Sequence, residues 1–179
     1  MPYQFRDPIH GFIEVSDLEI KIIDSLPFQR LRNIKQLATT YLVYPGAEHT
    51  RFGHSLGVMH LVTRAFDLAL ENYKMAQGKD LFENTRKEWY KQILRLIALT
   101  HDLGHAPFSH ASEALFDGGV EHEDFTRKII CETEIAQCIR EIGNEFRRKY
   151  SVGEEYDITP ELLWLIYGEK NPELNSQYI

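Results

Sequence analysis

Apolar side chains recur at helical spacing over most of the chain, and this periodicity restricts the fold to a mainly helical one. Helices are expected over 55–76 and 86–103, near Glu123, near Glu134 and from Thr159-Pro160. Ser16 and Glu19 have the spacing of a capping box, which predicts an earlier helix start. The stripes predicted to be buried after it are Leu18, Ile22 and Leu26, then Phe28, Leu31, Ile34 and Leu37.

Two short segments have a strand pattern instead. Residues 7–15 are interpreted as a turn running into a strand, and a second strand is expected at Tyr41–Tyr44, where Pro45-Gly46 closes it. Segments of this length form only a small ribbon. We therefore predict an all-α fold with a small N-terminal β ribbon, in a single domain over 1–179.

The composition indicates which partners are not expected for the chain and in which cellular compartment it is expected. The net charge of −7 does not favour nucleic acid as a partner, without excluding a basic cleft. Apolar stretches fall short of the ~20 residues that cross a bilayer, so no membrane is expected. Only Cys131 and Cys138 are present, and we expect buried thiols in a reducing cytoplasm rather than a disulfide.

The most informative polar residues are histidines. His101 and Asp102 end an apolar helix, where an ionisable pair is costly to bury unless something neutralises it, and a divalent cation is one solution. His105 and His110 follow within ten residues, where Gly104 and Pro107 interrupt the helix. Imidazole and carboxylate suit Fe, Mn, Zn, Ni or Mg. The alternative is a solvated loop with incidental histidines.

His54 is the second element of this pattern. It shares one helix face with Val58, Leu61, Ala65 and Leu68, at the start of a helix whose first-turn amides attract anions. Arg51 lies three residues before it. A histidine on an apolar face is also compatible with a simple core position, but this combination suits a metal beside a phosphate.

Four stretches carry a resemblance to a known family: Asp7–Gly11, Phe28–Leu37, Tyr44 to Gly57, and His101–His110. In these the chain resembles the HD-domain metal-dependent phosphohydrolases, and more narrowly their deoxynucleoside triphosphate triphosphohydrolase branch. The resemblance implies that His54, His101 and Asp102 bind one divalent metal ion. The family's fourth ligand is an Asp on a later helix, so the chain is expected to be the N-terminal part of a longer protein. Asp124 and Asp157 do not match its context.

The resemblance also implies a reaction and a set of roles. The family splits a deoxynucleoside triphosphate into deoxynucleoside and inorganic triphosphate. By this resemblance the catalytic residues are His105, His110, Glu113 and His122, and the substrate-binding residues are Arg51, Gln36 and Leu37. His110, oriented by Glu113, would protonate the leaving 5′ oxygen. General acid catalysis of this kind raises the reaction rate by roughly 10²–10⁴-fold. His105 and His122 would donate to the α-phosphate, and Gln36 with Leu37 would flank the sugar.

Simpler interpretations stay open for some of these residues. Arg51 is expected either to bind phosphate oxygens or to pair with an acid such as Glu48. Glu113 and His122 are alternatively surface residues on solvated turns.

A regulatory site is a further implication of the resemblance. Asp24, Gln29 and Arg32 match positions that recognise guanine between subunits in some tetrameric members, which implies a regulatory nucleotide and a homo-oligomer, dimer or tetramer. Tyr3 and Arg6 replace the flanking lysine and asparagine of that site. An ordinary charge pair on a helix surface is the alternative.

Two other functions compete with the triphosphohydrolase. One is an HD-type phosphodiesterase or nuclease acting on a cyclic nucleotide or an oligonucleotide. The other is a non-catalytic nucleotide-sensing module, which the missing fourth ligand favours.

The regulatory hypothesis predicts that Asp24→Ala abolishes nucleotide-dependent assembly, because the carboxylate that accepts from the guanine edge is lost. The measurement is molar mass by light scattering with and without dGTP. If dGTP leaves the oligomer mass of the wild-type protein unchanged, the hypothesis of a regulatory nucleotide site is refuted.

Overall fold

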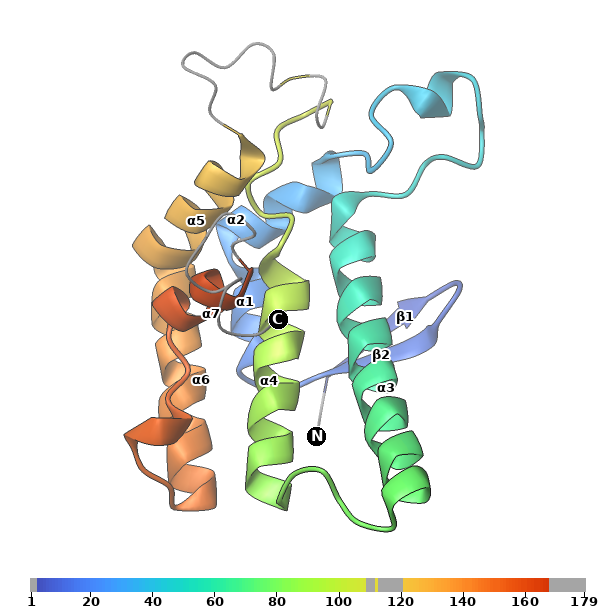
Figure 1. Ribbon diagram of the computed structural model, residues 1–179. Helices are drawn as coiled ribbons and strands as arrows, with labels where there is room; N and C mark the ends of the chain where they lie inside the picture. Colours follow the sequence, from blue (N-terminus) through green and yellow to red (C-terminus); the bar gives the residue numbers. More distant parts are fainter. Residues whose placement is uncertain (1–2, 109–111, 113–120, 168–179) are drawn as a thin grey trace.

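The helices expected from the periodicity form the body of the protein (Figure 1). The computed structural model describes residues 3–108, 112 and 121–167. Its elements are β1 (Tyr3–Asp7), β2 (Gly11–Val15), α1 (Glu19–Asp24), α2 (Leu26–Gln29), η1 (Arg30–Asn33), η2 (Thr40–Leu42), α3 (Arg51–Gln77), α4 (Asn84–Thr100), α5 (His122–Glu132), α6 (Glu134–Tyr150), η5 (Glu154–Tyr156) and α7 (Pro160–Tyr167). The predicted fold class, mainly helical with a small N-terminal ribbon, is confirmed.

Two long antiparallel helices organise the packing. In Figure 1, α3 and α4 run side by side, with α5, α6 and α7 beyond α4 and the β ribbon behind α3. Met59 of α3, Leu96 and Leu99 of α4 and Ile139 of α6 are fully buried in the core between these helices. Because α3 and α4 are antiparallel, the start of α3 lies at the same end of the molecule as the end of α4.

Most of the predicted buried stripe is found in the core, but its ends are not. Ile22, Phe28 and Leu31 are fully buried, whereas Leu26 is 80% exposed and Leu37 is 47% exposed. The helix ends at Asp24 and Ser25 has extended backbone, so helical spacing no longer relates Leu26 to Ile22.

The predicted capping box is confirmed before α1. The Ser16 amide donates to Glu19 Oε2 (2.9 Å), and the Glu19 amide donates to Ser16 Oγ (3.1 Å).

Glu19 is also a buried partner of Arg95 on α4. Arg95 Nε and Nη2 donate to the two carboxylate oxygens of Glu19, each at 2.8 Å, and Gln92 Nε2 donates to Oε1 at 3.0 Å. The same guanidinium donates to the Glu14 carbonyl (3.0 Å) and to Thr63 Oγ1 (3.1 Å). Burial acts to raise the pKa of Glu19, but Arg95 and the other donors outweigh it and hold that pKa below its ordinary value. One side chain thus joins α4 to β2, α1 and α3.

The ribbon is a hairpin of β1 and β2, so the predicted pairing was wrong. Tyr3 pairs with Val15 and Asp7 with Gly11 in an antiparallel register. Asp7 Oδ1 accepts from the amides of Ile9 and His10 (2.8 Å each), and Gly11 has a φ of 77°, so the turn is closed locally.

The strand predicted at Tyr41–Tyr44 is not formed. Residues Thr40–Leu42 form η2, and the Thr40 carbonyl accepts from the amides of Val43 (3.0 Å) and Tyr44 (2.9 Å). Val43 and Tyr44 are 74% and 65% exposed, so burial does not favour a strand there.

The bounds of the two long helices also differ from the predicted ones. Helix α3 begins at Arg51 rather than near residue 55, and α4 ends at Thr100 rather than at Leu103. As a result, His54 lies inside α3 and not before it, and His101 follows α4 and does not lie within it.

The composition predicted no membrane span and two buried thiols. Within the described ranges, none of the helices has the length and apolarity that a membrane span requires. Cys131 of α5 and Cys138 of α6 are free thiols, but they are half-buried rather than buried.

We predict that Arg95→Ala lowers the free energy of unfolding by about 3–5 kcal/mol at pH 7, because Glu19 is left charged and buried. The wild-type contribution of Glu19 is fully present above its unfolded pKa of about 4.3, and it is lost as the pH falls through the lower folded pKa. Urea denaturation between pH 7 and pH 3 measures both effects.

The control is Lys21→Ala, which removes an exposed partner of Glu141 and is expected to leave the urea midpoint unchanged. Equal midpoints for wild type and Arg95→Ala at pH 7 would contradict the prediction.

Candidate functional site

Three predicted ligands lie together where the start of α3 meets the end of α4. His54 lies in the first turn of α3, and His101 and Asp102 directly follow α4. His101 Nε2 lies 3.3 Å from His54 Nε2 and 3.4 Å from Asp102 Oδ1, and His54 Nε2 lies 3.6 Å from Asp102 Oδ2. The convergence expected from the sequence is therefore confirmed.

These separations fit one shared cation. Two donors each ~2.1 Å from an ion, at a tetrahedral angle, lie about 3.4 Å apart. The separation of the two imidazole nitrogens, 3.3 Å, is close to that value. The contacts with Asp102 end on its two different oxygens, Oδ1 at 3.4 Å and Oδ2 at 3.6 Å, and one ligand atom from each of the three residues lies within 4.8 Å of the others. Two imidazoles and a carboxylate are also ligand types that first-row divalent metals accept.

The ring of His101 is oriented for ligation. Its Nδ1 lies 2.7 Å from the carbonyl oxygen of Ala98. A carbonyl can only accept, so Nδ1 carries the proton and Nε2 of a neutral ring presents its lone pair toward His54. A hydrogen bond of this kind, from the distal ring nitrogen to a carbonyl, is usual for histidines that bind metals.

Asp102 is held as a buried anion. Arg51 Nη1 donates to its Oδ2 at 2.6 Å, and His105 Nε2 lies 3.4 Å from its Oδ1. Burial acts to raise the pKa of Asp102, but the His105 hydrogen bond and the positive charge of Arg51 hold it well below its ordinary value. Arg51 therefore pairs with an acid, as the simpler interpretation expected, but the acid is Asp102, whereas Glu48 pairs with Lys35.

His105 and His122 stack on each other although seventeen positions separate them. Their ring centroids lie 3.8 Å apart with an interplanar angle of 16°. His105 is buried, and this burial is the largest cause that lowers its pKa. The His122 side chain is only 13% exposed, so its interpretation as a solvated surface residue is wrong.

The setting of His54 differs from the predicted one in two respects. Its amide donates to the Thr50 carbonyl (3.1 Å) and the Arg51 amide donates to the Ile34 carbonyl (2.9 Å), so neither is free for an anion. Its helix face is not a core face, because Leu61 and Leu68 are 49% and 53% exposed. Burial is the largest cause that lowers the pKa of His54.

The remaining predicted residues lie elsewhere or outside the described part. Gln36 and Leu37 are on the segment between η1 and η2, where the Gln36 amide donates to the His49 carbonyl (3.1 Å). His110 and Glu113 fall outside the described residues. Of the two acids outside the family context, Asp124 accepts from the Glu121 amide (3.1 Å) at the start of α5. Asp157 accepts from the Ile158 amide (3.1 Å).

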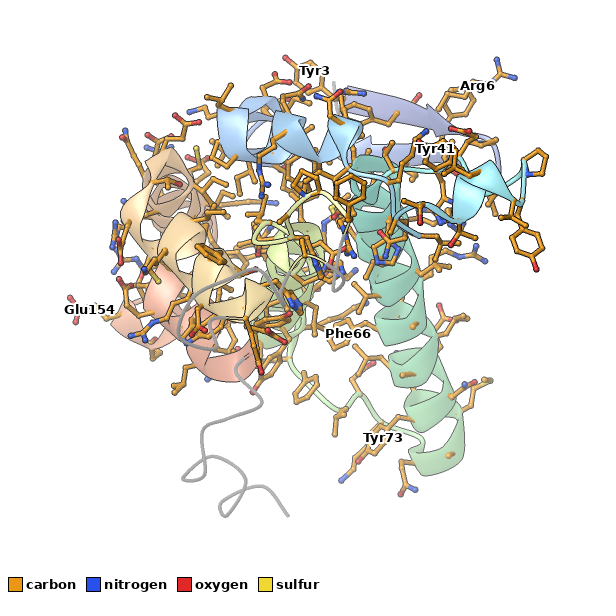
Figure 2. All side chains as sticks on the ribbon, turned by 90° about the horizontal axis from the view of Figure 1, so that it is seen from above. Tyr3, Arg6, Tyr41, Phe66, Tyr73 and Glu154 are labelled. Carbon is orange, nitrogen blue, oxygen red and sulfur yellow. The ribbon has the colours of Figure 1, made fainter. Side chains whose placement is uncertain are left out.

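The residues of the predicted regulatory site lie on neighbouring turns. Arg32 Nε donates to Gln29 Oε1 (2.7 Å), and Gln29 Nε2 donates to the carbonyl of Ile23, next to the exposed Asp24. Figure 2 shows Tyr3 and Arg6 on the hairpin with their side chains pointing away from the helices.

Arg30 contacts the site and was not predicted from the sequence. It donates through Nη1 to the His105 carbonyl (2.8 Å) and through Nη2 to the Leu103 carbonyl. It therefore fixes the backbone directly after Asp102. The only sequence signal was its position inside the stretch Phe28–Leu37 that carries the resemblance.

Comparisons with known proteins agree with this arrangement. A family model described as the HD domain matches residues 51–166. The chain is 45% identical over 147 residues to YwfO of Bacillus subtilis (strain 168), an uncharacterized protein, covering 79% of this chain and 30% of that one. It is 43% identical over 130 residues to the deoxynucleoside triphosphate triphosphohydrolase SAMHD1 homolog of Dictyostelium discoideum, covering 70% of this chain and 24% of that one.

The crystal structure of a hypothetical protein from Aquifex aeolicus matches with a TM-score of 0.62 and 38% identity, covering 96% of this chain and 43% of that one. The chain thus spans less than a third of the length of the two curated relatives above.

We predict that His101→Ala weakens Mn²⁺ binding by at least about 10²-fold, since even the loss of an outer-shell partner of a ligand costs about 10–100-fold. Isothermal titration calorimetry with Mn²⁺ measures the change. His60→Ala is the matched control, because His60 also lies on α3 but contacts His10, with ring centroids 5.4 Å apart. Equal Mn²⁺ affinities of wild type and His101→Ala would show that the cluster is not the binding site.

Proposed function

Because this chain belongs to the HD-domain family, we propose that it is a metal-dependent phosphohydrolase that splits deoxynucleoside triphosphates into deoxynucleoside and inorganic triphosphate. The observation that carries the proposal is the convergence of His54, His101 and Asp102, with a hydrogen-bonded His101 ring and a buried, ionised Asp102.

The choice of substrate rests on relatives. Besides the Dictyostelium protein, the deoxynucleoside triphosphate triphosphohydrolase SAMHD1 of Gallus gallus is 47% identical over 116 residues, covering 64% of this chain and 17% of that one. These proteins are named for the activity that we propose here.

A divalent ion at His54, His101 and Asp102 would supply Lewis-acid stabilisation of negative charge on the phosphate. The His105 hydrogen bond and Arg51 together keep Asp102 ionised, and Arg51 fixes one of its oxygens. In this proposal Arg51 therefore positions a ligand as well as adding positive charge near the substrate. His105 and His122 would donate hydrogen bonds to α-phosphate oxygens, where charge increases as water attacks phosphorus.

The leaving 5′ oxygen needs a proton when its bond to phosphorus breaks. His110, oriented by Glu113, remains our proposed acid, and Gln36 with Leu37 remain the proposed neighbours of the sugar. A regulatory guanine nucleotide at Asp24, Gln29 and Arg32, and assembly into a homo-oligomer, are part of the same proposal. The hydrogen bond between Arg32 and Gln29 supports a preformed polar surface there.

We predict that the full-length protein releases intact triphosphate from dNTPs in the presence of Mn²⁺. Asp102→Asn is expected to lower the rate of this release by at least about 10²-fold. The amide keeps the volume of Asp102 but removes its charge. Ion chromatography identifies the inorganic product, and circular dichroism checks folding. Glu48→Gln, at an exposed acid paired with Lys35, is the control and is expected to keep full activity.

The products separate the competing functions. Cleavage of a cyclic nucleotide or an oligonucleotide without triphosphate release would replace the proposal by a phosphodiesterase or nuclease. Binding of metal and nucleotide without turnover would replace it by a sensing module. An undiminished rate in a folded Asp102→Asn variant would refute the site itself.

A further inference from the structure

Thr126, in the second turn of α5, is fully buried beside the candidate site. The amide of Gly104 donates to Thr126 Oγ1 at 2.9 Å. The hydroxyl in turn lies 3.0 Å from the carbonyl oxygen of His122 and 3.4 Å from that of His101. A threonine hydroxyl has one proton and two lone pairs, so it can accept from Gly104 while donating to the nearer carbonyl, that of His122.

These hydrogen bonds bridge two segments whose main chains are in contact. A Cβ atom at Gly104 would overlap the carbonyl oxygen of His122 and the amide nitrogen of Thr126. Only glycine therefore permits this approach of the 103–105 backbone to the first turn of α5. The contact also brings a buried amide to a buried hydroxyl, which supplies the acceptor that the amide needs.

The bridge joins main-chain groups at or next to the two residues whose rings are stacked. Gly104 directly precedes His105, and the carbonyl that accepts from Thr126 belongs to His122 itself. The two rings are stacked at 3.8 Å, and His105 also contacts Asp102 at 3.4 Å. Stacked flat rings can slide over each other, whereas the hydrogen bonds of Thr126 fix the two backbone segments that carry them.

We infer that Thr126 is a positioning residue, whose hydroxyl holds the 103–105 backbone against the start of α5 and so keeps His105 and His122 in register. It acts through these histidines and not by touching substrate. The effect on catalysis rests on the proposed function, in which both rings donate to the α-phosphate. The effect on the ring geometry does not.

The test compares Thr126→Ser with Thr126→Ala, a pair that both lack the methyl group and differ only in the hydroxyl. With the complete chain, Mn²⁺ and a dNTP, Thr126→Ser is expected to keep kcat within about 3-fold of wild type. Thr126→Ala is expected to lose about 10–100-fold in kcat with a smaller change in KM, because the two donors act mainly as charge develops. Thr126→Val, which keeps the side-chain volume, replaces the alanine variant if that variant does not fold.

A second readout needs no activity. In proton–carbon NMR of histidine-labelled protein, stacking shifts the ring protons of His105 and His122 by ring currents. Thr126→Ser is expected to keep these shifts, and Thr126→Ala or Thr126→Val to lose them. Thr133→Ala is the control: Thr133 caps α6 by accepting from the Ile135 amide (3.3 Å), so its loss is expected to lower Tm while leaving the ring shifts and kcat unchanged.

The outcomes separate this inference from the proposed function. If wild type releases no triphosphate, the proposed function fails, but the NMR comparison still tests Thr126. If Thr126→Ala and Thr126→Val keep the ring shifts of Thr126→Ser, Thr126 is a packing residue only and the inference is overturned. Loss of the ring shifts without any loss of kcat would overturn its catalytic part.

Discussion

The buried ion pair of Arg51 and Asp102 is the interaction on which the site depends. It joins the first residue of α3 to the turn after α4, with Nη1 and Oδ2 only 2.6 Å apart. Two such charges are strongly unfavourable in a core unless each has the other, so the pair restricts how the two helices can slide. His54 lies one turn after Arg51 and His101 directly precedes Asp102. One register of the helices therefore brings both imidazoles and the carboxylate to one point.

The sequence predicted well what depends on local pattern. Helical spacing identified α3, α4, α6 and α7, because one face of each must meet the core. It failed for Tyr41–Tyr44, whose apolar side chains are exposed, and for the partner of Gly11–Val15, since Tyr3–Asp7 pairs through a turn that Asp7 closes. The helix start at Arg51 was missed because Gly53 and Gly57 weaken the helical pattern there.

The candidate site was predictable only in part, because the sequence pattern reports neighbours along the chain and not contacts between distant residues. His101 and Asp102 are neighbours in sequence, and an apolar helix that leads to an ionisable pair is a visible anomaly. That His54 joins them followed from the resemblance, not from spacing. The partner of Arg51, the contacts of Arg30 with two carbonyls and the bridge at Gly104 link residues far apart in the chain. Such contacts involve main-chain atoms or a distant partner, which leave no periodic signal.

The candidate site is unevenly shielded from water. The His54 and His101 side chains are 33% and 20% exposed, whereas that of Asp102 is 7% exposed and is enclosed by Arg51 and His105. An ion that exchanges with the solution would therefore enter and leave across the two rings.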